Sequence, residues 1–78
     1  MPPVYPEVAR QAGVEGDVVL RAYISSEGRV TELKVLAGPP ILARAAINAV
    51  QQWRYQPVKI NGRAANVVTT LIIAFRMQ

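Results

Sequence analysis

Two segments in the first half of the chain alternate between apolar and polar residues. Over residues 17–25, one face carries Val18, Leu20, Ala22 and Ile24. Over residues 29–36, one face carries Thr31, Leu33 and Val35, and the other carries Glu32 and Lys34. A period of two is typical of strands with one buried face, and Ser26-Glu27-Gly28 supplies a short turn between them. The pattern therefore predicts an antiparallel β-hairpin.

Helical spacing replaces this alternation after a break at Gly38-Pro39-Pro40. The apolar stripe comprises Leu42, Ala45, Ala46, Ala49, Val50 and Trp53. Its many alanines favour close packing of this helix against a sheet. Pro57 prevents the helix from continuing, because proline lacks the backbone N–H and clashes with the preceding turn.

A shorter helix is predicted near the N-terminus. Pro6 suits its first position, where the missing N–H costs nothing, and Gly13 is a natural stop. The apolar face of this helix would consist of Val8, Ala9 and Ala12. Tyr5 precedes the helix and is expected to lie across its start.

The C-terminal part of the chain reads as a short strand, a tight turn and a long strand. Val58-Lys59-Ile60 is the short strand, and Asn61-Gly62 predicts a type I′ turn. The last strand should run from about residue 65 to residue 77, with its helix-facing side formed by Val67, Leu71, Ile73 and Phe75. The order of elements predicts an α+β domain. Two helices pack on one face of a three-stranded antiparallel sheet, with an extra short hairpin strand before the last strand.

Composition limits the function classes. A chain of 78 residues, 51% hydrophobic and 18% charged, is expected to form one small domain over residues 1–78. Residues 1–4, with their two prolines, are consistent with the end of a linker. No cysteine or histidine is present, so the usual nucleophile–base pairs and zinc sites are not available. The sequence therefore predicts a protein that is not an enzyme and needs no metal or cofactor.

A nucleic-acid-binding sheet is the first alternative to consider, because the formal charge is +4. Tyr23 and Phe75 are aromatic side chains on predicted strands, and such side chains can stack on bases. These aromatics form no compact motif with the basic residues, however, and Phe75 fits the core face of its strand. No nucleic-acid partner is expected.

The segment from Trp53 to Pro57 stands where the long helix returns the chain to the sheet. A tryptophan there can close the end of the core, so Trp53 is interpreted as structural. The segment also belongs to a set of features with a familiar order and spacing, namely Tyr5-Pro6, Gly16, Gly28, Ala49-Val50 and Trp53-Arg54-Tyr55-Gln56-Pro57. From Pro3 to Phe75 the chain resembles the C-terminal domain of TonB, the periplasmic energy transducer of Gram-negative bacteria.

The resemblance implies a partner and a mechanism. In this family, an inner-membrane helix outside the present chain engages the ExbB–ExbD motor, and the periplasmic C-terminal domain binds the TonB box of an outer-membrane receptor by strand addition. Force passed through the added strand then opens the receptor for nutrients such as iron chelates. The implied partner-binding residues lie in the last strand, at Val67, Val68, Thr69, Thr70, Leu71, Ile72, Ile73 and Ala74. Tyr55, past the helix end, is a further candidate for a partner contact.

Some features leave alternatives open. Val8 stands where better-known members carry an arginine near the receptor, and the hairpin around Asn61-Gly62 replaces their glycine- and proline-rich loop. A TolA-like domain, or an envelope protein-interaction domain attached to a sensor, has a similar architecture. An edge strand that accepts a peptide can also pair with a second copy, which predicts a homodimer, either edge to edge or strand-exchanged.

Overall fold

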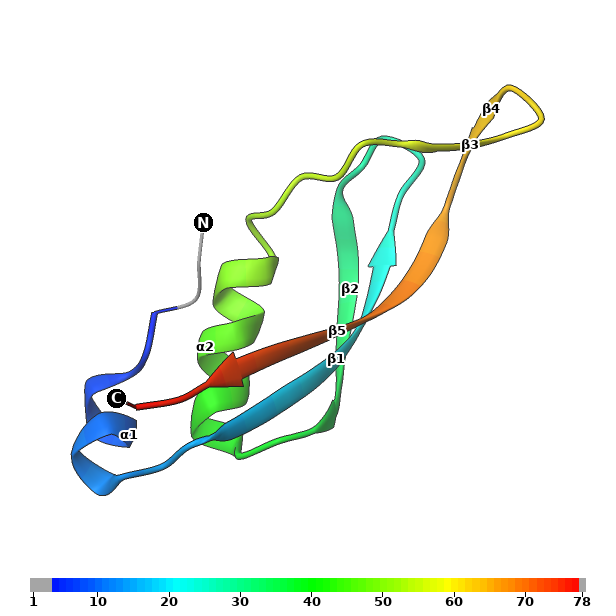
Figure 1. Cartoon of the computed structure of the whole chain (residues 1–78). Coiled ribbons are helices and arrows are strands. Elements are labelled where there is room, and N and C mark those ends of the chain that lie inside the picture. Colours follow the sequence, from blue (N-terminus) through cyan, green and yellow to red (C-terminus); the bar gives the residue numbers. More distant parts are fainter. Residues whose placement is uncertain (1–3, 78) are drawn as a thin grey trace.

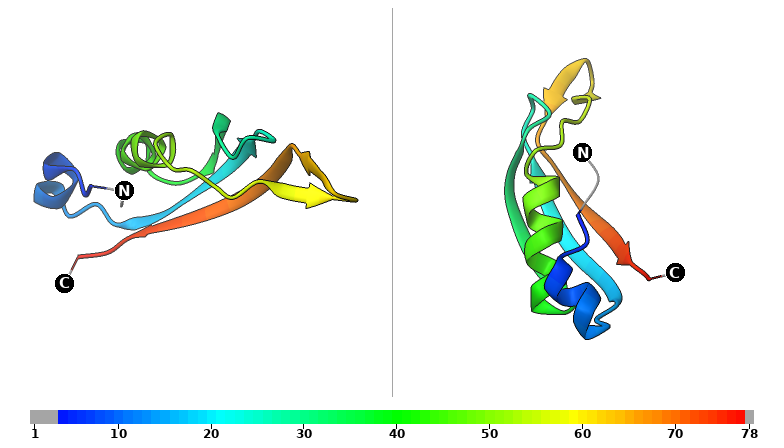
Figure 2. Two further views of the ribbon diagram at one scale, coloured as in Figure 1. Left: turned by 90° about the horizontal axis from the view of Figure 1, so that it is seen from above. Right: turned by 90° about the vertical axis from the view of Figure 1, so that its left-hand side faces the viewer.

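The computed structural model describes residues 4–77. Its elements in chain order are α1 (Glu7–Ala12), β1 (Gly16–Ile24), β2 (Val30–Ala37), α2 (Pro40–Val50), β3 (Val58–Ile60), β4 (Arg63–Ala65) and β5 (Val67–Phe75). Three strands form one antiparallel sheet in the order β2-β1-β5, and β3 pairs with β4 in a separate hairpin. Both helices lie on the same face of the three-stranded sheet (Figures 1 and 2). The predicted fold class is confirmed.

The middle strand β1 supplies the centre of the core. Its side chains alternate as predicted, and those on the helix-facing side, Val18, Leu20, Ala22 and Ile24, are buried. The core cluster also contains Leu42, Ala46 and Val50 of α2 and Ile73 and Phe75 of β5. Removing a Leu or Val side chain of this kind from water stabilises the fold by about 1.5–3 kcal/mol. Packing on β1 therefore joins both neighbouring strands and α2.

A β-bulge corrects the predicted face of β2. Tyr23 pairs with Glu32 but the next residue, Ile24, pairs with Val30, so that Thr31 is an extra residue in the ladder. An extra residue reverses the side-chain alternation. Val30 therefore packs against the core, whereas the hydroxyl of Thr31 donates a hydrogen bond of 3.1 Å to the carbonyl oxygen of Tyr23.

The helices are shorter than predicted. α2 ends at Val50, and the backbone N–H of Trp53 then donates to the carbonyl oxygen of Val50 in a tighter turn, at 3.0 Å. In α1 only Ala9 is buried, while Val8 is 66% exposed. Successive helical residues point about 100° apart, so a helix that turns Ala9 toward the core turns Val8 away, and Ala12 is exposed as well. Pro6 is the N-cap of α1 rather than its first residue.

The predicted last strand is divided in two. Asn66 separates β4 from β5, and its side-chain oxygen accepts a hydrogen bond of 2.8 Å from the backbone N–H of Ser26. At the other end β5 stops at Phe75, opposite Gly16, because β1 begins there and offers no further partner. The type I′ turn is confirmed by positive φ angles at Asn61 (53°) and Gly62 (80°).

Gly28 allows the crossing segment, residues 51–57 between α2 and β3, to pass over the β1–β2 turn. The backbone N–H of Tyr55 donates to the carbonyl oxygen of Gly28 at 2.9 Å, and Arg54 forms a single bridge with Arg29. A Cβ at position 28 would lie 1.9 Å from the carbonyl oxygen of Tyr55, and φ at Gly28 is +85°. Any side chain at this position would therefore push the crossing segment away.

We expect Gly28→Ala to destabilise the domain far more than Gly62→Ala. Gly62 also has a positive φ (+80°), but a Cβ there would meet no atom within 4 Å. The control substitution should therefore cost about 1–2 kcal/mol for backbone strain alone. Gly28→Ala should cost at least about 3 kcal/mol, a large part of the roughly 5–15 kcal/mol that holds a domain folded. Urea unfolding followed by circular dichroism measures both, and equal losses would contradict the close-approach argument.

Candidate partner-binding edge

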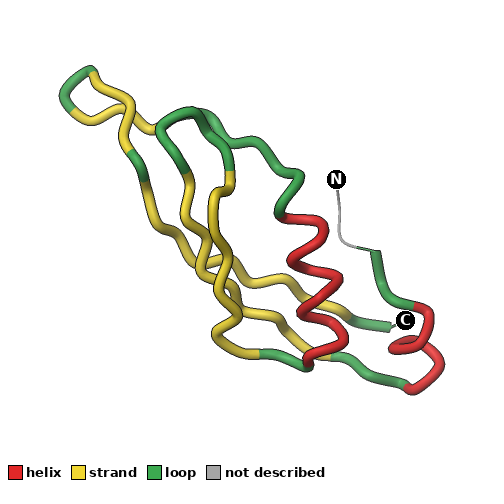
Figure 3. The backbone as a smooth tube through the Cα atoms, turned by 180° about the vertical axis from the view of Figure 1, so that it is seen from behind, coloured by secondary structure: helices red, strands yellow, loops and turns green. Residues whose placement is uncertain are grey.

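β5 forms a regular edge of the sheet. It pairs with β1 over nine consecutive positions, from Gly16↔Phe75 to Ile24↔Val67, without a register shift. Within residues 4–77, no strand pairs with the second side of β5. An edge strand of this kind presents a row of unpaired N–H and C=O groups to an incoming chain. Figure 3 shows β5 and the rest of the sheet from behind.

The other edge strand, β2, is less suited to strand addition. Its pairing with β1 is interrupted twice, between Val19 and Leu20 and between Tyr23 and Ile24. Bulges bend and twist a strand, and they are a common way of blunting an exposed edge. Lys34 of β2 also lies over the ring of Tyr23, 5.6 Å from its centroid. The uninterrupted edge of the sheet is therefore β5.

The structure brings all eight predicted last-strand residues together on β5 but divides them between two faces. The side chains on the helix-facing side are half-buried or buried and belong to Val67, Thr69, Leu71 and Ile73. The side chains on the opposite face are exposed and belong to Val68, Thr70, Ile72 and Ala74. Ile72 is 68% exposed and Val68 57% exposed. A strand added to this edge would find apolar side chains on both faces of its neighbour.

The end of β5 is anchored to the N-terminal part of the domain. The rings of Tyr5 and Phe75 are in edge-to-face contact, with centroids 5.5 Å apart and an interplanar angle of 83°. The hydroxyl of Tyr5 donates a hydrogen bond to the carbonyl oxygen of Val14. Beyond the strand, Arg76 forms an ion pair of 2.9 Å with Asp17.

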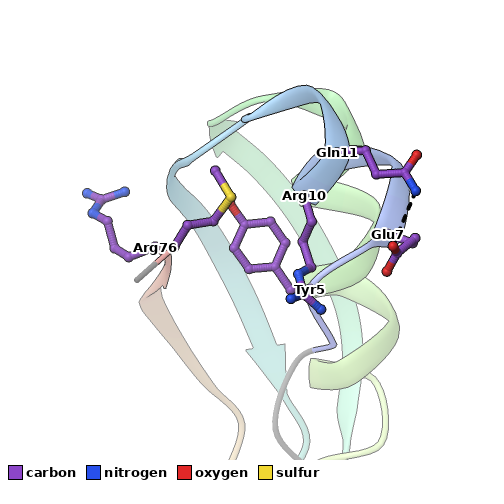
Figure 4. Close-up of a pocket in the computed structure, with 6 residues that line it drawn as sticks. Tyr5, Glu7, Arg10, Gln11 and Arg76 are labelled. Atoms are coloured by element: carbon purple, nitrogen blue, oxygen red, sulfur yellow. Dashed lines mark hydrogen bonds between the residues drawn. The ribbon is translucent and has the colours of Figure 1, made fainter.

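A hollow of about 580 Å³ opens at this end of the edge. Its lining residues are Tyr5, Glu7, Arg10, Gln11, Arg76 and Met77. Figure 4 shows Arg10 beside Tyr5, while Arg76 points away from them. Glu7 accepts a hydrogen bond of 3.3 Å from the side chain of Gln11. These contacts do not gather the acids that a metal ion needs, and no group of three or more potential metal-ligating side chains occurs among residues 4–77.

Tyr55 lies at the opposite end of the edge from the hollow. Its backbone is held by the β1–β2 turn, and that turn follows Ile24, which pairs with the first residue of β5, Val67. Partial burial raises the pKa of the Tyr55 phenol above its ordinary value of 10.0. Tyr55 therefore lies near the Val67 end of β5. Its contact with a partner stays a prediction.

Comparison with known proteins shows the family. The family model described as the Gram-negative bacterial TonB protein C-terminal matches residues 1–77. The chain belongs to the TonB C-terminal family. In the part of this TonB C-terminal domain that the structure describes, no helix is both long enough and apolar enough to cross a bilayer.

Curated relatives and solved structures agree with this assignment. The chain is 32% identical to the protein TonB of Pseudomonas aeruginosa over 99% of its own length, and 36% identical to that of Xanthomonas campestris over 82%. It covers only 23% and 30% of those two relatives. The solution structure of the Pseudomonas aeruginosa TonB C-terminal domain has a TM-score of 0.84 at 31% identity, covering 100% of this chain and 81% of that one. The Helicobacter pylori domain has a TM-score of 0.69 at 28% identity, covering 95% of this chain and 79% of that one.

The predicted motif residues of the TonB C-terminal domain lie mostly at junctions between elements. Tyr5 and Pro6 lead into α1, Gly16 begins β1, and Pro57 directly precedes β3. The sequence marked Gly38 only as part of a break between strand and helix, and it did not show that a Cβ there would lie 2.9 Å from the carbonyl oxygen of Asp17. A glycine between a strand and two prolines was the available signal. Asn66 was also missed, because its partner Ser26 lies 40 positions away.

We expect Trp53→Ala to reduce the stability of this TonB C-terminal domain. Trp53 is half-buried and packs against the core cluster, although it lies beyond the end of α2. Truncation of a buried aromatic residue costs about 3–5 kcal/mol, and partial exposure should bring the loss near the lower figure. Urea unfolding measures it. If the variant unfolds at the same urea concentration as the parent but no longer binds a partner peptide, Trp53 is a contact residue and the structural interpretation is wrong.

Proposed function

We propose that this chain is the periplasmic receptor-binding domain of a TonB-type energy transducer. In this proposal the TonB box of an outer-membrane transporter adds as a strand to β5. The observation that carries the proposal is the regular open edge of β5, nine residues long and free of bulges. Family membership supports it, since a transducer must hold a transporter segment in the envelope of a Gram-negative cell.

Strand addition fits the chemistry of this edge. In an antiparallel pair, alternate residues exchange hydrogen bonds with the partner strand. Because β1 uses one set of these residues, the other set along β5 directs its N–H and C=O groups outward. Backbone pairing supplies affinity for many sequences, and side-chain contacts add selectivity. Val68 and Ile72, both exposed, are the apolar side chains that such contacts would use.

The attachment of β5 suits it to bear a load. Force applied along an added strand would act on the nine-position ladder between β1 and β5, whose hydrogen bonds would have to break together. The Tyr5–Phe75 ring contact and the Arg76–Asp17 ion pair hold the end of the same strand. In the proposed assembly, the pull comes from an inner-membrane ExbB–ExbD motor through parts of the transducer outside this chain. The load serves the uptake of nutrients such as siderophores.

Hydrogen exchange tests the proposed strand addition. In the free chain we expect every second amide between Val67 and Phe75 to exchange rapidly with deuterium, because it is unpaired at the edge. A synthetic TonB-box peptide should protect this set and leave the amides bonded to β1 nearly unchanged. NMR of the ¹⁵N-labelled chain reads each amide separately.

Peptides N-methylated at alternate residues provide the control. Methylation of the alternate residues whose N–H groups point toward β5 should weaken binding by at least about tenfold, because several backbone hydrogen bonds of about 0.5–1.5 kcal/mol each are lost. Methylation of the intervening residues, whose N–H groups point away from β5, should leave the dissociation constant unchanged. Protection that appears on β2, or a binding peptide that protects none of the β5 amides, would overturn the proposal.

We further propose that self-association uses the same edge. An open edge strand can pair with its copy in a second chain. A homodimer, whether paired edge to edge or strand-exchanged, would then compete with the peptide for β5. Light scattering should show a dimer fraction that rises with protein concentration and disappears at saturating TonB-box peptide. A dimer that persists with the peptide bound would place the two interfaces apart.

A further inference from the structure

The hairpin arm, residues 58–65, projects beyond the end of the three-stranded sheet (Figures 1 and 3). It consists of β3, the Asn61-Gly62 turn and β4. Residues 58–64 are all exposed, including Val58 at 46% and Ile60 at 57%. A lone two-stranded hairpin is marginally stable in water. The side chains of this arm are therefore available for a contact outside the domain.

Charge is distributed unevenly along the molecule, which measures 48 × 21 × 19 Å. All five acidic residues lie at or before Glu32, so the chain from residue 33 onward carries only basic charges. The arm holds Lys59 and Arg63. The crossing segment and the β1–β2 turn that support the arm add Arg54 and Arg29, which are bridged through their backbones. The acids at this end are Glu27 in the turn and Glu32, which pairs with Tyr23 near the start of β2. Four basic residues against two acids make the arm end of the domain net cationic.

The arm begins where the β5 edge ends. Only Asn66 separates β4 from β5, and its hydrogen bond to Ser26 fixes that junction. Arg63 precedes Val67 by four positions, which corresponds to about 13 Å of extended chain. A segment paired with β5 would therefore need an extension of about four residues to come level with Arg63.

The other end of the edge has a different character. The guanidinium of Arg76 is already paired with Asp17. The carboxylate of Glu15 accepts the backbone N–H of Met77 at 2.8 Å, and Glu7 lines the hollow nearby. Arg10 lines the same hollow, so the acids Glu7, Glu15 and Asp17 outnumber the two basic residues at this end. An acidic extension would be attracted at the arm end and would gain nothing at the Phe75 end.

We propose that the hairpin arm is a second contact site for the chain that adds to β5, and that it binds acidic residues flanking the added strand. Arg63 pairs with Ile60 and Lys59 with Ala64, so the two cations lie on opposite faces of the hairpin, and each takes a carboxylate on its own face. Because only one end of the edge is cationic and the paired strand has a single direction, an acidic flank is bound at only one terminus of the added segment, and that terminus reports the direction of the added strand. The inference rests on the proposed function, since it requires a segment on β5.

The test uses a TonB-box peptide extended outward by two threonines and then two adjacent glutamates, which alternate between the two faces, or by two threonines and two glutamines, at either its N- or its C-terminus. Isothermal titration at low ionic strength gives the dissociation constant for each peptide. At one terminus, the Glu extension should bind about fivefold more tightly than the Gln extension, the gain expected of exposed ion pairs. At the other terminus the two should be equal. The gain should vanish at roughly 1 M salt, where the screening length is about 3 Å.

Two double variants distinguish an effect of the arm residues from an effect of the net charge of the domain. Lys59→Gln/Arg63→Gln should abolish the gain while leaving the affinity for the unextended peptide unchanged. Arg10→Gln/Arg44→Gln removes the same charge elsewhere and should keep the gain. A gain at both termini, at neither, or one that survives in the arm variant overturns the inference while strand addition stands. If the unextended peptide does not bind, the proposed function fails, and this inference fails with it.

Discussion

The antiparallel ladder between β1 and β5 is the interaction on which this domain depends. β1 contributes its whole buried face to the core, and its nine-position pairing with β5 ties the N-terminal part of the sheet to the last strand of the chain. α2 packs on the resulting surface through small residues such as Ala46, which allow a close approach. A change that shifted this register by one residue would turn the buried face of either strand toward solvent.

The same ladder leaves β5 with one side unpaired, which is a functional opportunity and a liability. Natural proteins often blunt such edges with bulges, and the domain does this on β2 but keeps β5 regular. Different parts of β5 therefore serve the stability of the domain and the proposed binding of a partner. The helix-facing side chains of β5 hold it to the core, while its outer backbone and its exposed side chains, Val68 and Ile72, remain available to a partner.

The junction at Gly28 positions the hairpin arm beside the start of the β5 edge. The crossing segment that follows α2 rests on the β1–β2 turn through the Tyr55–Gly28 hydrogen bond. From there the chain continues directly into the hairpin arm and then into β5. The position of the cationic arm relative to the edge is therefore set by a glycine that no side chain can replace, and by the Asn66–Ser26 hydrogen bond.

Local pattern determined much of this protein. The alternation in β1, the alanine-rich stripe of α2, the Asn61-Gly62 turn and the helix-facing phase of β5 all follow from residue spacing, because each reflects a burial period or a backbone preference that acts over a few residues. The resemblance to the family rested on motif residues such as Trp53 and Gly28, whose partners the sequence did not name.

Tertiary structure decided the rest. A bulge set by pairing with β1 put Val30 rather than Thr31 on the core face. The end of β1 at Gly16 determined where β5 stops, and the long-range contact of Asn66 separated the arm from the edge. These features depend on pairs of residues far apart in the chain, which hydrophobic periodicity does not encode.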